Sequence, residues 1–549
     1  MQELQELQGN IDEIEQLTPD SLIHKLMSTV DDSINNWNQL PSPYSMLNMD
    51  IAVNRFIHAI NNNQRILFVH DSDADGIGTY MLSYIFFQKF IYNNIEIIIT
   101  DRSRGYGFVP SYITERQGTQ NLPDLVITAD NGITSHAACD LCKSLGIDVI
   151  ITDHHQVDQH EGIPNAIIVD PHQPNCPFPY KDINGTFVYW YFLKAIRDIS
   201  NTPIDMIEEF LPELCLTTIS DVMPLIHINR FVVKEGLQRF NIHHRQWVRT
   251  FVEVFKKPNI TAEDLAFNLI PAINATGRLT RAEESACFLA ADDKKVSLEW
   301  FTYIKSLNDV RKNKQENLLT TIYTKHDAWM QYPFITIPGD NFEKGLLGPC
   351  SSKLTDKYKK PAIVFSLNKD KTIYSGSGRT YGQINILQLV KNNPYVIQNR
   401  TGGHKQACGV SVKAEDWKHF WQQLQHDTSL LPPELYKDPT KTALGKIDLR
   451  YIDFELFKKI DFFQPFGQGF RNPLLQSTIT IKELKTIGKE RNHYSMVVTD
   501  GMCEIRAVQF FFNDKLEKNS KYDIVYSLNE DTYSGNGSIV LHIKDAIKL

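Results

Sequence analysis

The chain has 549 residues, of which 42% are hydrophobic, 22% charged and 11% aromatic, a mixture typical of folded globular proteins and unlike that of disordered or fibrous chains. At about 150 residues per domain, this length predicts three or four domains. The formal net charge of −8 excludes a uniformly basic protein that coats nucleic acid, so any phosphate binding must be confined to a local site.

The sequence has no features typical of a secreted protein, a membrane-spanning protein or a cysteine-rich zinc protein. The N-terminal residues lack the basic start and apolar run of a secretory signal. Apolar runs such as residues 95–99 are far shorter than the ~20 residues of a membrane helix. Cys139 and Cys142 form the one close pair, and their place in a predicted helix favours buried apolar residues over a zinc site. We therefore expect a cytoplasmic protein without a membrane partner.

Strands and helices alternate along the first half of the chain, after a poorly specified lead-in over residues 1–45. Short β-branched apolar runs predict the strands 65–69, 95–99, 124–128, 148–152 and 166–169, and the helices predicted between them include 77–90 and 135–145. This alternation is typical of a doubly wound, mostly parallel sheet with helices on both faces. The predicted fold class is therefore α/β.

The second half of the chain divides into further parts. A long polar helix is expected from about residue 297 to 325, followed by a smaller α/β region that ends near the prolines at 432–433. From about residue 440, many short strands predict a small β-barrel. The predicted domains are thus a lead-in (1–45), an α/β domain (46–295), a connecting helix (296–328), a smaller α/β domain (329–432) and a barrel (440–549).

Acids and histidines follow the predicted parallel strands, at the edge where ligands bind in doubly wound folds. A single acid there would be an ordinary turn or helix cap, but acids at several neighbouring strand ends repel one another unless a cation neutralises them. This pattern therefore predicts a divalent metal site. The strand-end residues are Asp71, Asp73, Asp75, Asp130, Asp153, His154, His155, Asp170 and His172.

The types of candidate ligand indicate which metal ion to expect and which reaction it would support. Carboxylates with one or two imidazoles suit Mn²⁺ and accommodate Mg²⁺, whereas zinc more often recruits thiolates or a histidine majority. This many ligands could hold two ions about 3.5–4 Å apart, which is the usual arrangement for hydrolysing phosphoesters or phosphoanhydrides. The sequence therefore predicts a phosphoryl hydrolase with a metal centre.

Glycine-containing segments supply candidate phosphate contacts. Residues 376–380 and 401–404 combine bare backbone amides with polar or cationic side chains, and Gly277–Arg278 is similar. Each segment alone is equally compatible with an ordinary turn. We interpret His243 and His244 as a solvated surface stretch rather than a metal site.

In their order along the chain, these segments resemble the DHH phosphoesterase superfamily and, within it, the RecJ family of single-stranded-DNA exonucleases. The resemblance covers nearly the whole chain beyond residue 45. The matching segments are 71–76, 130–133, 153–155, 219–225 with 229–230, 273–279, 376–379, 402–404 and, near the C-terminus, 465–467, 472–473, 493 and 510–513.

The resemblance implies a DHH domain, a DHH-associated substrate-binding domain and a C-terminal OB-fold. It also implies an exonuclease that digests single-stranded DNA from the 5′ end and releases 5′ mononucleotides, in DNA repair and recombination. Two divalent ions, preferably Mn²⁺ or else Mg²⁺, would serve as cofactors. A monomer is expected, with single-stranded DNA as the substrate and a single-stranded-DNA-binding protein and a helicase as candidate partners.

Roles for individual residues also follow from the resemblance. Asp130 would bridge both ions and act in catalysis with His154 and His155, of which His155 would contact the scissile phosphate or move a proton. Asp153 would orient a ligating imidazole without touching metal. The implied metal ligands are Asp71, Asp73, Asp75, Asp130, His154 and Asp221. The implied substrate contacts are Arg102, Arg104, Asn274, Arg278, Ser377, Arg379, Gly402, Gly403 and His404.

Two departures from the family pattern affect the substrate pocket. The segment 102–107 is about one residue shorter than usual before its Gly-Tyr-Gly, so either Arg102 or Arg104 could take the family arginine's part. Residues 184–187 and 405–406 replace smaller residues of the family. Two alternative functions stay open: a phosphoesterase for short oligonucleotides, nucleotide bisphosphates or cyclic dinucleotides, and a non-catalytic DNA-binding scaffold.

Overall fold

The computed structural model describes residues 15–157, 162–257, 259–436, 442–488, 491, 493–510, 515–531 and 538–549, with only the backbone of Asn399 and His404. The chain folds into two compact units. Of the described residues, 32–436 belong to the larger unit, and 15–31 together with those from 442 onward belong to the smaller one. Among the described residues, no helix has the length and apolarity needed to span a bilayer.

The larger unit begins with a five-stranded parallel sheet in the order β3-β2-β4-β5-β6. Its strands follow the apolar runs seen in the sequence, which confirms the predicted parallel sheet. The strands are β2 (Ile66–His70), β3 (Ile95–Ile99), β4 (Leu125–Ala129), β5 (Asp148–Thr152) and β6 (Ile167–Val169).

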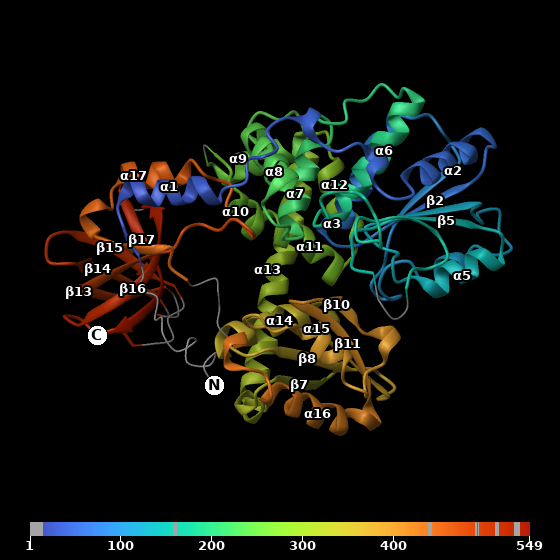
Figure 1. The fold of residues 1–549 in the computed structure, drawn as a ribbon. Helices are drawn as coiled ribbons and strands as arrows, with labels where there is room; N and C mark the ends of the chain where they lie inside the picture. The colour runs from blue at the N-terminus through green and yellow to red at the C-terminus, as the bar shows by residue number, and fades with distance from the viewer. Residues whose placement is uncertain are drawn as a thin grey trace, which may run out of the picture. The chain divides into compact units, whose positions relative to one another are not determined.

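Helices cover both faces of this sheet (Figure 1). On one face, strand side chains such as Phe68 and Ile127 join a core with α2 (Met49–Asn61), α3 (Ala74–Lys89) and α6 (Gly185–Ser200). On the other face, side chains such as Val69 and Val126 pack against α4 (Ser111–Thr114) and α5 (His136–Ser144). Burial on both faces explains why the strands are continuously apolar rather than alternating.

A helical region follows the sheet and leads into the long helix α13 (Lys294–Lys325). Asp293 caps α13 by accepting a hydrogen bond from the Val296 amide (3.0 Å), so the helix begins a few residues earlier than the sequence indicates. The preceding helices are α7 (Leu211–Ser220), α8 (His227–Phe240), α9 (Gln246–Phe255), α10 (Ala262–Asp264), a π-helix (Leu265–Leu269), α11 (Ile270–Leu279) and α12 (Glu283–Ala290).

The second lobe of the larger unit is built on a mixed sheet in the order β10-β11-β9-β8-β7. Strands β7 and β8 are parallel and the other neighbours are antiparallel. The elements are β7 (Ile335–Asp340), α14 (Lys344–Tyr358), β8 (Ala362–Leu367), β9 (Ile373–Arg379), α15 (Ile386–Lys391), β10 (Gly402–His404), β11 (Ala407–Lys413) and α16 (Trp417–Ser429).

Short 3-10 helices connect several of these elements. They are η2 (Trp37–Gln39), η3 (Pro43–Ser45), η5 (Asp327–Gln331), η6 (Gln398–Arg400), η7 (Ala414–Asp416) and η8 (Pro433–Tyr436) in the larger unit and η10 (Leu449–Tyr451) in the smaller one.

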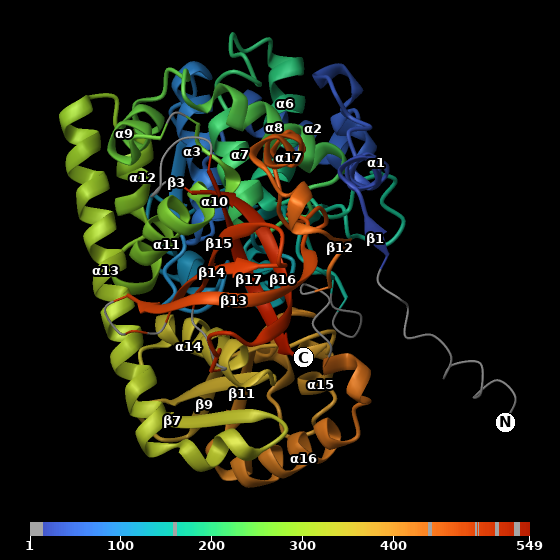
Figure 2. The same cartoon turned by 90° about the vertical axis from the view of Figure 1, so that its left-hand side faces the viewer.

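The smaller unit is a closed five-stranded barrel in the order β13-β14-β15-β17-β16, with β16 pairing back to β13, as predicted. Figure 2 shows its strands. The elements are β12 (Gly445–Ile447), α17 (Phe454–Asp461), β13 (Leu475–Ile487), β14 (His493–Thr499), β15 (Glu504–Gln509), β16 (Lys521–Glu530) and β17 (Ile539–Lys548).

Part of the N-terminal segment belongs to this barrel unit. Strand β1 (Gln16–Leu17) pairs with β12 in parallel, and α1 (Pro19–Thr29) lies beside α17. Leu22 and Leu26 of α1 are buried in the barrel's hydrophobic core. Residues 15–31 therefore form part of a folded unit whose other elements lie more than 400 residues away in the chain.

Candidate metal centre

The strand order of the parallel sheet places the acids at a single crevice. The chain leaves β2 toward β3 on one side and returns to β4 on the other, and the crevice at such a switch point is the usual ligand site of open α/β sheets. Asp71, Asp73 and Asp75 follow β2, Asp130 follows β4, and His154 follows β5.

The carboxylates of Asp73 and Asp75 accept hydrogen bonds from uncharged amide groups. Asp73 caps α3 by accepting hydrogen bonds from the amides of Asp75 and Gly76. The buried Asp75 carboxylate accepts hydrogen bonds from Asn184 Nδ2 (2.6 Å) and from the amides of Gly185 (2.8 Å) and Thr186 (3.1 Å). The first turn of α6 therefore fixes Asp75 without supplying a compensating positive side chain.

Asp130 sits at the centre of the acidic cluster. It has a left-handed backbone (φ 62°), and a Cβ on Gly185 would lie 2.3 Å from its Oδ1, so that the α6 terminus approaches it this closely only with glycine there. His154 Nε2 lies 3.2 Å from Asp130 Oδ1, 3.6 Å from Asp221 Oδ2 and 3.9 Å from Asp75 Oδ2. Asp221, which follows α7, thereby joins the strand-end residues.

Two neighbouring groups of ligand atoms could each hold a cation. Within each group the candidate atoms lie within 4.8 Å of one another. The short distance between Asp130 Oδ1 and His154 Nε2 links the two groups. The groups are Asp71, Asp73 and Asp130, and Asp75, His154 and Asp221.

Burial and mutual repulsion disfavour the charged form of these acids. Burial raises the pKa of Asp71, Asp130 and Asp221 above its ordinary value, and neighbouring carboxylates raise it further. Burial, with Asp73 nearby, raises the pKa of Asp75 to about 6. A divalent cation would relieve this repulsion.

Asp153 holds the loop that carries both histidines. Its carboxylate accepts hydrogen bonds from the amides of Ile133 (2.9 Å) and His154 (2.8 Å) and lies 2.7 Å from His155 Nδ1. Burial opposes charge on both partners, but their attraction lowers the pKa of Asp153 and raises the pKa of His155 to about 10. This pairing favours the charged form of His155, whose Nε2 lies 3.2 Å from the Tyr106 hydroxyl.

The two candidate arginines after β3 occupy different environments. Arg102 Nε donates to the Ser72 hydroxyl (3.0 Å), which lies within the acidic loop. Arg104 instead pairs with both carboxylate oxygens of Glu115 (2.8 and 2.7 Å) and lies over the Tyr112 ring. Arg102 is therefore the arginine of the two that reaches the cluster.

Several arginines come together beside the acids. Burial and the neighbouring Arg102, Arg311 and Arg379 lower the pKa of Arg278 to about 10, as expected for a buried guanidinium group close to groups of the same charge. On β9, Arg379 Nη1 lies 3.4 Å from Ser377 Oγ, and a Cβ on Gly348 of α14 would lie 3.1 Å from both side chains. This arrangement suits an anion such as a phosphate.

The remaining predicted substrate contacts have mixed positions. Asn274 Oδ1 accepts a hydrogen bond from the Ala74 amide (2.9 Å), which fixes the loop after β2. Gly402 and Gly403 lie in β10, where Gly403 has a φ of +136°. The side chain of His404 lies outside the described residues.

Some residues of the site escaped the sequence analysis. Arg311 lies in a polar run of α13, where no local pattern separates it from solvated neighbours. Asn184, Gly185 and Thr186 were noticed only as a departure from the family pattern, although a Gly at a helix start after a strand could have signalled close approach.

The interpretation of His243 as a solvated residue was wrong. His243 is 3% exposed, its Nε2 lies 3.0 Å from the Glu208 carbonyl oxygen and its Nδ1 accepts a hydrogen bond from the Arg245 amide. Backbone partners on both ring nitrogens therefore explain the burial. His244 is exposed, as expected.

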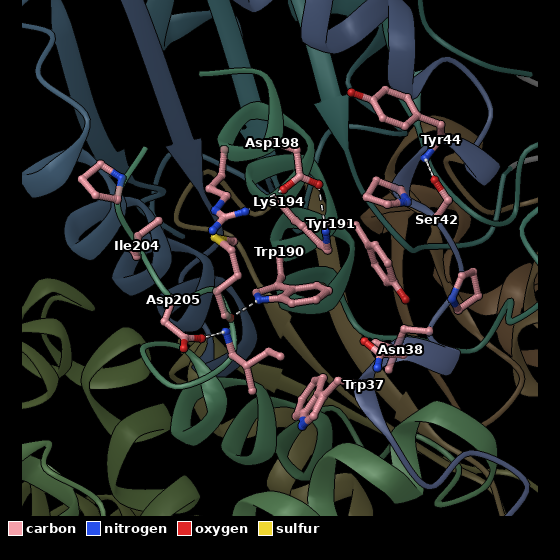
Figure 3. A pocket seen from close by; sticks show the side chains of 17 residues that line it. Trp37, Asn38, Ser42, Tyr44, Trp190, Tyr191, Lys194, Asp198, Ile204 and Asp205 are labelled. Atoms are coloured by element: carbon pink, nitrogen blue, oxygen red, sulfur yellow. Dashed lines mark hydrogen bonds and ion pairs between the residues drawn. The ribbon is translucent and has the colours of Figure 1, made fainter. Parts of the chain in front are cut away.

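A separate cavity of about 750 Å³ lies at the other end of α6 (Figure 3). The chain segment 37–44, the C-terminal half of α6 and residues 203–207 line it. Trp190 Nε1 donates to the Met206 carbonyl (2.7 Å), and Lys194 pairs with Asp198. The cavity contains none of the predicted site residues.

Comparison with family models defines the class of protein. The model for the DHH family, N-terminal domain, matches residues 65–219, the DHHA1 domain model matches 330–427, and the RecJ OB domain model matches 445–545. The chain therefore contains, in order, regions that match the DHH, DHHA1 and RecJ OB domain models, which confirms the predicted fold class.

The individual proteins that this chain resembles are RecJ exonucleases. The chain is 27% identical to the single-stranded-DNA-specific exonuclease RecJ of Haemophilus influenzae, over 91% of this chain and 90% of that protein. It is 26% identical to RecJ of Escherichia coli, over 92% and 90%. The crystal structure of Thermus thermophilus RecJ with Mn²⁺ has a TM-score of 0.78 at 20% identity, over 98% and 79%. The chain is thus a homologue of the RecJ exonucleases, and its class is that of the metal-dependent nucleases.

Proposed function

We propose that the protein is a 5′-to-3′ exonuclease specific for single-stranded DNA, which hydrolyses phosphodiester bonds with two divalent ions and releases 5′ mononucleotides. The observation that carries the proposal is the pair of ligand groups linked by Asp130 and His154, next to the group of arginines. The names of its RecJ relatives supply the strand preference, and the family resemblance supplies the polarity.

The donor set of the site fits divalent ions. Asp221 Oδ2 is a buried oxygen that has no hydrogen-bond partner among the described residues, and burial holds the pKa values of the neighbouring Asp130 and Asp75 above their ordinary value. Asp71, Asp73 and Asp130 would hold one ion, and Asp75, His154 and Asp221 the other, with Asp130 shared. When bound, such ions activate water and stabilise the leaving oxygen. We propose Mn²⁺ as the preferred ion, since an imidazole is among the ligands.

The chain's own groups would bind and orient the substrate. The His155 cation, held by Asp153, lies where it could contact a phosphate oxygen. Arg278 and Arg379, with Ser377, would hold the 5′-terminal phosphate and so determine which bond reaches the metal centre. Arg102 would take the part that the family pattern left open between two arginines.

The barrel unit offers a surface for bases. His493 and His542 each contact the Phe510 ring edge-on, at centroid distances of 5.3 and 5.4 Å. Phe510 directly follows β15 and His493 begins β14, which are the third and second strands of the barrel, and OB-folds bind oligonucleotides on that face. Burial lowers the pKa of His542 to about 4, which favours a neutral His542 ring, and aromatic rings of this kind stack on bases.

Further parts of the proposal rest on the family relationship. They are action as a monomer in the cytoplasm, in DNA repair and recombination, with a single-stranded-DNA-binding protein and a helicase as partners.

The test uses single-stranded DNA labelled at the 5′ or the 3′ end, with Mn²⁺, beside blunt duplex and an Asp130→Ala variant. We expect immediate release of a 5′-labelled mononucleotide, retention of the 3′ label on shortening strands, and no cleavage by the variant. Cleavage of only short or cyclic dinucleotides would favour a small-substrate phosphoesterase. Binding without any cleavage would favour a DNA-binding scaffold.

A further inference from the structure

Val222 occupies a strained backbone position directly after Asp221. Helix α7 ends in a turn in which the Met223 amide donates to the Thr218 carbonyl (3.2 Å), and Val222 has a φ of +54°. This position of a helix end usually holds glycine, because a side chain crowds the backbone in the left-handed region. A β-branched residue there is a true outlier.

The other left-handed residues show how unusual this valine is. Among the described non-glycine residues with positive φ, Val222 is the one that is β-branched. The ends of α6, α9 and α14 also adopt this conformation, and they use Asn201, Lys256 and Lys359. An unbranched side chain or glycine was therefore an available solution at the end of α7.

Packing does not compensate for the strain at Val222. Its side chain is 60% exposed and belongs to none of the hydrophobic clusters formed by the described residues. An exposed valine gains little from burial, so the fold itself has no evident use for its methyl groups. Residues kept in strained conformations gather at functional sites.

Val222 directly follows a candidate metal ligand in the chain. Asp221 Oδ2 lies 3.6 Å from His154 Nε2, so the next residue along the chain lies at the rim of the candidate metal centre. The apolar part of a nucleotide substrate is its nucleoside, and an exposed apolar side chain beside the metal centre would pack against that part. The charged phosphate would instead be held by the ions and arginines.

We propose that Val222 is a substrate-binding residue whose methyl groups pack against the nucleoside next to the phosphate at the metal centre. The proposal rests on the proposed nuclease function and adds to it a contact that recognises the sugar or base rather than the phosphate. Strain at Val222 is then kept in exchange for substrate affinity, and relieving it should stabilise the fold while weakening binding.

The test compares Val222→Gly with the wild type and with Lys256→Gly, a matched control at another left-handed helix end. Both variants should raise the thermal midpoint by about 1–3 °C. Only Val222→Gly should raise KM for single-stranded DNA, by about fivefold to tenfold, given the value of small apolar contacts in substrate discrimination. Val222→Ala, which keeps Cβ, should raise KM by a smaller factor.

Several outcomes would overturn the proposal. A lower thermal midpoint for Val222→Gly would show that the valine stabilises the fold, and an unchanged KM would show that it does not touch substrate. A shift in the Mn²⁺ concentration needed for activity, with KM unchanged, would mean that Val222 acts through Asp221. If the wild type itself does not cleave single-stranded DNA, the nuclease function fails and this proposal fails with it.

A substrate lacking the base at the cleaved nucleotide distinguishes the two parts of the nucleoside. If the KM difference between Val222→Gly and the wild type disappears with this substrate, the valine packs on the base. If the difference persists, the valine packs on the sugar, and both results support the proposal.

Discussion

Lowering the pH below about 6 should weaken the binding of divalent ions because Asp75 must then lose a proton before it can act as a ligand. The carboxylate is buried, and burial with Asp73 nearby raises its pKa from an ordinary 3.8 to about 6. Since the folded-state pKa is raised, the metal-free fold binds the proton more tightly than the unfolded chain does. The ionised form is therefore destabilising above pH 6, and this penalty disappears as the pH falls toward 4.

The size of the effect follows from the shift. About two pKa units at ~1.36 kcal/mol each give about 3 kcal/mol for keeping Asp75 ionised in the metal-free fold at pH 7. Below pH 6, the association constant for Mn²⁺ should fall about tenfold per pH unit from this one proton. Burial and neighbouring carboxylates also raise the pKa of Asp130 and Asp221, so protons on these acids would oppose metal binding in the same direction.

Titration calorimetry with Mn²⁺ between pH 5 and 8, at constant ionic strength, measures this dependence. Comparing metal-bound with metal-free protein removes contributions from groups whose protonation does not depend on the metal. An Asp75→Asn variant should bind Mn²⁺ weakly and lose the component near pH 6. An association constant that stays flat from pH 7 to 5 would refute the assignment of Asp75 as a ligand.

Three further predictions follow from the geometry. Gly185→Ala should weaken Mn²⁺ binding at least about tenfold and leave the circular dichroism spectrum unchanged, because the added Cβ would lie 2.3 Å from Asp130 Oδ1. The control is Gly409→Ala, where the nearest atom to an added Cβ lies at 3.9 Å. Equal Mn²⁺ affinities of the two variants would contradict the assignment of Asp130 as a ligand. Arg379→Ala should lower kcat/KM about tenfold or more for strands with a 5′ phosphate and less for strands with a 5′ hydroxyl, since a charge-assisted contact is lost; an equal loss on both strands would argue against a role at the terminal phosphate. Leu22→Ala should destabilise the barrel unit by about 2–5 kcal/mol in denaturant titrations, and no change would mean that α1 is not part of its core.

The sequence predicted the sheet and the gathering of acids at one of its edges because both depend on local patterns. Runs such as 95–99 are strand-length, β-branched and bounded by polar turns, and the structure has β3 there. Parallel strands bring their carboxyl ends to one edge, so acids after β2 and β4 meet although about 60 residues separate Asp71 from Asp130.

Features that depend on distant partners could not be read from the sequence. Which of Arg102 and Arg104 reaches the acidic cluster depends on Glu115, because its carboxylate pairs with Arg104. The pairing of β1 with β12 joins segments some 430 residues apart, and nothing in the local pattern of residues 15–31 signals a partner in the barrel. The burial of His243 likewise depends on a carbonyl group 35 residues earlier in the chain.

The site separates its charges in a way that suits a phosphodiester. Among the described residues, the Asp75 carboxylate accepts hydrogen bonds from uncharged amide groups at the start of α6, so its charge is left for a cation to balance. The arginines gather instead around Arg278, where burial and their own repulsion lower its pKa. Acids without cations and guanidinium groups without anions each carry an electrostatic cost in isolation. Bound metal ions would balance the charge of the acids, and the phosphates of a DNA strand would balance the charge of the arginines. Because each ligand also attracts the other, we expect metal and DNA to bind cooperatively.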